Sequence, residues 1–187
     1  MFLKLKIVNT LNFKGNVMAI IYSLGTTDTE ANRLRMLFGS GICEDYIRFI
    51  KNKNGMFLDG DSYCTIPFSK VDDKEIDFLE LYGLNAKNKN MDIEIANSNF
   101  SDEIQKIEKP IIIGGDSGGN FFVLSSNKDD SKVYYWDRTH IHFDCAYDFE
   151  EVDEEGNLYI LANSYSEFTS LIDSNIEGDK SSKTKLL

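Results

Sequence analysis

The hydrophobic pattern at the start of the chain predicts a short strand and then a helix. Residues 2–8 alternate apolar and basic side chains, which is typical of a half-buried strand. Thr27 and Glu30 have the spacing of a capping box, in which each side chain accepts a hydrogen bond from the other residue's free backbone N–H group. A helix should begin here and end in a left-handed cap at Gly39. Its apolar face would consist of Ala31, Leu34, Leu37 and Phe38.

The middle of the chain predicts a second helix, short strands and a polar surface helix. Residues 44–51 carry acids in the first turn and a lysine in the last, which suits the helix dipole, and Gly55 follows as a stop. Residues 56–68 and 78–82 are typical of short strands. The pattern of residues 93–107 favours a helix on the surface.

The second half of the chain is rich in β-type sequence. The apolar run at 111–113 leads into residues 114–119, which contain too many glycines for regular structure. We expect a closing amphipathic helix over 166–172 and a polar tail after it. Three β-rich runs lie between the glycine-rich segment and this helix, at 121–125, 133–137 and 141–145. The first two are predicted to form a hairpin.

These elements predict a single α+β domain in which helices flank a largely antiparallel sheet. Residues 27–173 would form this domain. Residues 1–26 would be an N-terminal extension with an extra strand, and residues 174–187 a polar tail. A length of 187 residues with 42% hydrophobic residues is enough for one sizeable core.

The charge of the chain narrows the classes of partner. It has 31 acidic against 20 basic residues, a formal net charge of -11. Such a charge disfavours nucleic acids and anionic membranes and suits a basic protein partner. The plainer alternative is that the charge only keeps the protein soluble.

Cysteine usage and the N-terminus indicate a cytoplasmic protein. Cys43, Cys64 and Cys145 are an odd number without a CxxC pair, which fits neither a disulfide framework nor a zinc site. The apolar run at 17–24 lacks the cleavage site of a secretory signal. The sequence has no stretch approaching the roughly 20 apolar residues that a transmembrane helix needs.

The peptide at 115–119, Gly-Asp-Ser-Gly-Gly, is the one that surrounds the nucleophile of trypsin-like serine proteases. In those enzymes the base histidine and the aspartate precede the serine. Here His140 and His142 both follow Ser117, and too little chain precedes it for two β-barrels. We therefore interpret the peptide as a tight turn, and we expect no enzymatic activity.

Metal binding is a weaker alternative for the residues after this turn. His140, His142 and Asp144 alternate along one predicted strand and could face the same way, but a solvated strand explains them equally. The segment Asp59-Gly60-Asp61 lacks the spaced acids of a calcium loop. We expect no metal and no cofactor.

Two neighbouring segments are candidates for binding another protein. The hairpin end at Trp136, Asp137 and Arg138 combines an aromatic ring with charges, as interface hot spots do. Trp136 fits a core position equally well. The acidic run that follows could dock a basic partner or form a solvated loop. Its candidate contact residues are Asp148, Glu150 and Glu151.

Several segments, in order, resemble the SUKH superfamily of Smi/Knr-type, cell-wall-assembly-regulator-like domains. The match extends over residues 27–173. It is carried by Glu30, Gly41-Ile-Cys-Glu-Asp-Tyr46, Asn54-Gly55, Leu81-Tyr-Gly-Leu84, Ile113-Gly-Gly-Asp-Ser-Gly-Gly-Asn120, Val133-Tyr-Tyr-Trp-Asp137 and Ile160-Leu-Ala-Asn-Ser-Tyr-Ser-Glu-Phe168. The chain departs from the family at Cys43, where proline is usual, and at Arg138-Thr139, where His-Glu is common.

The resemblance implies a binding protein. In bacteria such domains act as immunity proteins that block a toxin, often a nuclease, and eukaryotic relatives serve as signalling scaffolds. Both roles stay open at this point, and a toxin partner would be basic. The residues expected to maintain the fold are Glu30, Asn54, Gly55, Gly115, Asp116, Gly118, Gly119 and Asn120.

Overall fold

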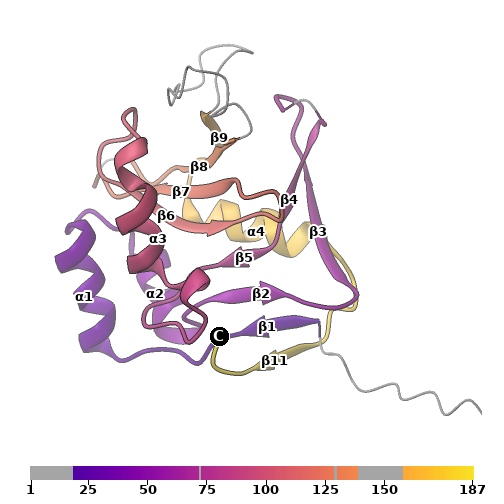
Figure 1. Cartoon of the computed structure of the whole chain (residues 1–187), viewed down its shortest axis with the longest axis horizontal. Helices are drawn as coiled ribbons and strands as arrows, with labels where there is room; N and C mark the ends of the chain where they lie inside the picture. The colour runs from indigo at the N-terminus through magenta and orange to yellow at the C-terminus, as the bar shows by residue number, and fades with distance from the viewer. Residues whose placement is uncertain (1–18, 72, 129, 139–157) are drawn as a thin grey trace, which may run out of the picture.

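The computed structural model describes residues 19–71, 73–128, 130–138 and 158–187, and most of its strands belong to one sheet (Figure 1). The eight strands of this sheet lie in the order β11-β1-β2-β5-β6-β7-β8-β9. Neighbours pair antiparallel except β1 and β11, which run parallel. The strands are β1 (Ile20–Tyr22), β2 (Met56–Leu58), β5 (Glu80–Leu81), β6 (Pro110–Gly115), β7 (Phe121–Ser125), β8 (Val133–Trp136), β9 (Leu158–Ala162) and β11 (Ser182–Thr184).

The centre of the large sheet is covered on both faces. Helix α3 (Ile93–Phe100) packs on β6, and α4 (Tyr165–Asn175) lies behind the sheet in the view of Figure 1. Successive residues of β7 point to opposite faces. Phe121 meets Phe100 of α3 with ring centroids 5.2 Å apart, whereas Phe122 meets Phe168 of α4 at 5.1 Å. All of β7 is therefore buried, which explains its unbroken apolar sequence.

A second, three-stranded sheet completes the core on the α4 side. It has the order β10-β3-β4, with bounds Ile176–Gly178, Ser62–Pro67 and Glu75–Phe78. Buried and exposed residues alternate along β4, as expected of a strand with one solvated face. Its Phe78 contacts Phe122 and Phe168 at centroid distances of 5.6 and 6.4 Å. Helix α4 thus joins the two sheets.

The two helices near the N-terminus follow the sequence pattern. In α1 (Asp28–Phe38) the capping box between Thr27 and Glu30 is present. Helix α2 (Glu44–Asn52) agrees with the predicted range 44–51. The apolar face of α1 is narrower than predicted, because Leu37 is 46% exposed. Gly39 has φ +103° and ψ 158°, which is not the left-handed cap that we expected.

The predicted helix over 93–107 is shorter and more buried than its sequence indicated. Helix α3 ends at Phe100 and is preceded by the 3-10 turn η1 (Lys89–Met91) and followed by η2 (Ser101–Glu103). The amide of Asn97 is buried, donates to the carbonyl of Ile112 at 2.9 Å and accepts from its backbone N–H at 2.9 Å. A polar residue in this sequence therefore fastens the helix to β6 instead of facing solvent.

Both ends of the described chain add strands. Residues 174–187, expected to be a polar tail, contain β10 and β11, which extend the two sheets. Within residues 1–26, β1 pairs with β2 and buries Ile21 completely. The strands predicted at 2–8 and 141–145 lie outside the described residues. The described architecture confirms a single α+β domain with a largely antiparallel sheet.

Candidate functional site

The segment from Gly114 to Asn120, called the glycine turn below, folds around the side chain of Asp116. One carboxylate oxygen accepts hydrogen bonds from the backbone N–H groups of Gly118 (2.8 Å) and Asn120 (2.9 Å). The other accepts from the Asn120 amide and the Tyr135 hydroxyl, both at 2.8 Å. Burial, and then the charge of Asp116, raise the pKa of Tyr135, which keeps its hydroxyl protonated as a donor. All the acceptor positions of this carboxylate are therefore used.

Close approach of backbones, rather than the Gly118-Gly119 pair, accounts for most of the glycine requirement in this turn. A Cβ atom on Gly114 would lie 2.2 Å from the Glu80 carbonyl oxygen, and one on Gly115 would lie 3.0 Å from the Tyr82 hydroxyl. Gly119 has φ +89°, which favours glycine. A Cβ on Gly118 would meet neighbours only at 3.4 Å, and Gly118 is not among the residues with positive φ, so neither close approach nor backbone conformation requires glycine there.

The hairpin end lies against the glycine turn and is largely internal. Trp136 is 1% exposed, so its ring is a core residue and is not available as the aromatic anchor of an interface. The guanidinium of Arg138 lies over the rings of Phe100 and Phe121, 4.6 and 4.8 Å from their centroids. It also pairs with Glu103 at 3.5 Å. Asp137 is partly buried. The other predicted contacts, Asp148, Glu150 and Glu151, lie outside the described residues.

The remaining residues assigned to the fold act in turns far from the hairpin. The carboxylate of Glu30 accepts from the backbone N–H of Thr27 at 3.2 Å, and its hydrogen bonds lower its pKa. Asn54 fastens the turn before β2 to the loop after β5, because its amide donates to the Leu84 carbonyl at 2.9 Å and accepts from the Leu84 N–H at 2.8 Å. Gly55 follows with φ +119°.

A cleft of about 330 Å³ opens between the glycine turn, the end of β5 and helix α3. We call it the turn cleft. Glu80 and Tyr82 are two residues apart at β5, which directs both side chains to the same face of the sheet. The other lining residues come from η1, α3, the glycine turn and the start of β7: Lys89, Asn90, Ile95, Ala96, Asn99, Phe100, Gly115, Asp116, Gly119, Asn120 and Phe121.

Glu80 and Tyr82 are polar groups of this cleft to which the described part of the chain supplies no hydrogen-bond partner. Among the described residues no donor reaches the Glu80 carboxylate, and burial alone raises its pKa to about 7. Tyr82 is 4% exposed, and within the same residues its hydroxyl makes no hydrogen bond. Burial, followed by the charges of Glu80 and Asp116, raises the pKa of Tyr82. A charged or donor group entering the cleft could satisfy both.

Our sequence analysis missed Glu80 and Tyr82. A signal was present, since Glu80 interrupts an otherwise apolar run, Phe78-Leu-Glu-Leu-Tyr82. An acid in the middle of a strand between apolar neighbours is unusual enough to mark a special position.

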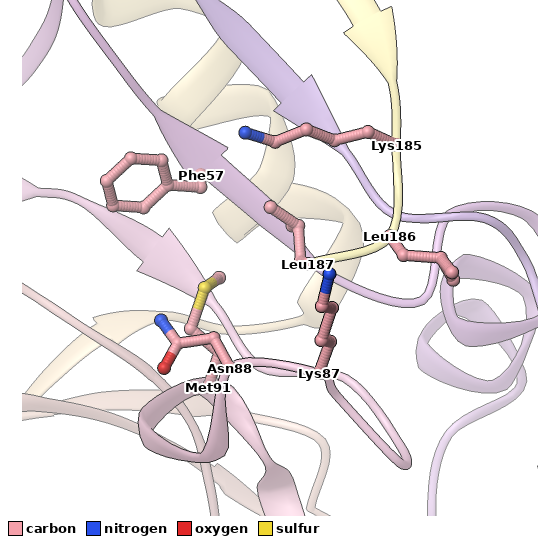
Figure 2. Close-up of a pocket in the computed structure, with 7 residues that line it drawn as sticks. All are labelled: Phe57, Lys87, Asn88, Met91, Lys185, Leu186 and Leu187. Carbon is pink, nitrogen blue, oxygen red and sulfur yellow. The ribbon is translucent and has the colours of Figure 1, made fainter.

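A second hollow, of about 380 Å³, is lined by β2, by the segment around η1 and by residues 185–187 (Figure 2). Phe57 of β2, Met91 and the final leucines supply most of its wall. The backbone N–H of Lys87 donates to the carbonyl oxygen of Leu187 at 2.5 Å, which holds Leu187 beside the hollow. Of the described residues that line it, Lys87 and Lys185 have charged side chains. Its apolar wall offers little to orient a ligand.

The described residues contain little of the chemistry that an enzyme or a metal needs. The Ser117 hydroxyl is exposed and lies 3.5 Å from a carboxylate oxygen of Asp77, with no histidine in the described ranges. His140, His142 and Asp144 fall outside those ranges, as does Cys145. Burial raises the pKa of the Cys43 and Cys64 thiols, which makes them poor nucleophiles. No group of three potential metal ligands occurs in the described part of the chain.

The fold is that of a small, largely antiparallel α+β domain with helices on both faces of its main sheet. The family model of the SMI1/KNR4 family (SUKH-1) matches residues 25–170, so the chain belongs to this family. The resemblance noted from the sequence motifs is thereby confirmed. The curated proteins contain no match to the chain. Where the structure is described, every helix falls short of the length or the apolar character that a membrane-crossing helix requires.

Proposed function

We propose that this chain is a cytoplasmic immunity protein that neutralises a bacterial toxin by binding it directly. Family membership over residues 25–170 carries the proposal, since SUKH domains commonly act as immunity proteins. The formal net charge of -11 supports a basic partner, and many toxins that cleave nucleic acids carry basic active sites. The protein would act by covering such a site and would catalyse no reaction itself.

The charge also predicts how the complex forms. An acidic inhibitor is attracted to a basic active site over long distances, and salt screens this attraction. Association should therefore slow as ionic strength rises, while dissociation changes less.

Co-expression tests the proposal. The toxin encoded beside this gene, produced in a bacterial host with and without this chain, should stop growth only in its absence. The purified pair should form a stable complex whose association rate falls between 50 and about 500 mM salt. Absence of both protection and complex would refute the proposal. A pull-down that returned several partners and no toxin would favour a scaffold in signalling or cell-wall assembly instead.

A further inference from the structure

The two acids of the turn cleft differ in what they can still accept. Asp116 receives four hydrogen bonds from the glycine turn and Tyr135, which uses its acceptor positions. Glu80 receives none from the described residues. A carboxylate that is partly withdrawn from water and left unpaired is unfavourable for the free protein. Of the two carboxylates, Glu80 is therefore the one that can still accept hydrogen bonds from a ligand.

The two described cations nearest the cleft, Lys89 and Arg138, each have an acidic neighbour other than Glu80. Lys89, the one basic residue of the lining, donates to the Ala86 carbonyl at 3.1 Å and lies 3.7 Å from Asp92. Arg138 stacks on Phe100 and pairs with Glu103. The charges of Glu80 and Asp116 raise the pKa of Tyr82 and the charge of Arg138 lowers it, whereas burial alone accounts for the raised pKa of Glu80. Within the described residues the Glu80 carboxylate therefore has no ion-pair partner.

We propose that the turn cleft receives a lysine or arginine side chain of the toxin, with the Glu80 carboxylate as its ion-pair partner and the Tyr82 hydroxyl as a second acceptor. The inference rests on the proposed function and names the part of the partner that this cleft recognises. A cation suits the site because it gains the charge-assisted hydrogen bond that Glu80 lacks, and the surrounding low dielectric strengthens that bond.

The dimensions of the cleft agree with a single side chain. About 330 Å³ is near the lower limit of roughly 300–1,000 Å³ for small-ligand sites, so a helix or a folded loop would not enter. The rings of Phe100 and Phe121 and the amides of Asn90 and Asn99 would surround the aliphatic part and the rim. A basic side chain inserted here is the kind of centre from which an interface gains most of its affinity.

A small probe tests the site without any toxin. Methylguanidinium has the charge of an arginine head group, and N-methylurea has nearly the same shape without the charge. We expect methylguanidinium, at the millimolar concentrations that so small a ligand needs, to shift the amide NMR signals of Gly115 and Asn120. N-methylurea should leave them in place. Glu80→Gln should abolish the shifts, whereas Glu75→Gln, the same change at an exposed residue of β4, should preserve them.

Equal shifts with both probes, or shifts that persist in Glu80→Gln, would overturn the assignment of the cleft. The melting temperature of each variant checks that it is folded.

The toxin complex supplies the second measurement. Glu80→Gln should raise the dissociation constant of the toxin complex at least tenfold, because the toxin's cation would be buried without its ion-pair partner. The dissociation constant of Glu75→Gln should stay within twofold of the wild-type value. If wild-type protein binds and Glu80→Gln binds equally well, this inference fails and the proposed function stands. If wild-type protein neither binds nor protects, the proposed function fails and the inference with it.

Discussion

Asp116 and Glu80 carry the same functional group on two sides of one cleft, yet their surroundings are opposite. Asp116 is enclosed by donors that belong to its own turn and to β8. Glu80 lies at the end of β5, where burial raises its pKa to about 7 and no described donor compensates it. The comparison teaches that an acid in a motif can be structural while an unremarked acid beside it remains available for a partner.

The physical reason for the difference lies in the chain distance of the donors. Each donor to Asp116 except Tyr135 is within four residues of it, so the turn satisfies the carboxylate as it forms. Glu80 is brought under η1 and α3 only by the tertiary fold. Its partner would have to come from another element, and none supplies one in the described chain.

The largest effect should come from Gly114→Ala, which breaks the contact between the two regions. The added Cβ would lie 2.2 Å from the Glu80 carbonyl oxygen and 3.1 Å from a methyl group of Leu81, in the middle of the β5–β6 pairing. Neither strand can move without disturbing its other neighbour, so we expect the free energy of unfolding to fall by roughly 3 kcal/mol. Urea denaturation measures the change. Gly118→Ala is the matched control and should stay within about 1 kcal/mol, because its neighbours are 3.4 Å away or more.

A smaller loss is expected from Asp116→Ala, which removes the satisfied carboxylate. Two backbone N–H groups and the Tyr135 hydroxyl would lose their acceptor, and the turn is partly open to water that can replace some bonds. We expect destabilisation of roughly 2 kcal/mol in the same urea experiment.

Asp77→Ala is the control for Asp116→Ala. It removes an exposed carboxylate whose hydrogen bonds with Thr65 and Ser117 are long, 3.3 and 3.5 Å. It should change the free energy of unfolding by less than about 0.5 kcal/mol. Equal effects of the two substitutions would contradict a structural role for Asp116.

Short-range patterns were sufficient to predict much of the fold. The capping box of α1, helix α2 and the β7–β8 hairpin depend on residues close in sequence, and the structure contains them. The β11 strand was not predictable in this way, because Ser182–Thr184 is polar and joins β1 through backbone pairing. The burial of Trp136 depends on Phe121 and on strands on both sides, so composition alone left its role open.

The candidate site was less accessible to sequence analysis than the fold. The motif 114–120 predicted a turn, but it drew attention away from Glu80, which lies 34 residues before Gly114. Whether that acid is solvated, paired or isolated depends on where α3 and the side chains of η1 settle, which local patterns do not encode.

Apart from the controls, the smallest expected effect is that of Glu80→Gln, which has the opposite sign. Burial raises its pKa from the usual 4.5 to about 7, so between these values the folded protein binds a proton that the unfolded chain has lost. Stability from this group is therefore fully present below about pH 4.5 and declines as the pH rises through about 7. The full shift would correspond to about 3 kcal/mol, but water in the open cleft screens part of it. Glu80→Gln should accordingly match the wild type near pH 4.5 and exceed its stability by roughly 1 to 2 kcal/mol at pH 8.

Urea denaturation of both proteins across this range isolates the effect, because the other titrating groups, histidines included, contribute equally and cancel in the difference. Glu75→Gln should show no such divergence, and a constant difference between Glu80→Gln and the wild type at every pH would mean that the Glu80 carboxylate is fully solvated.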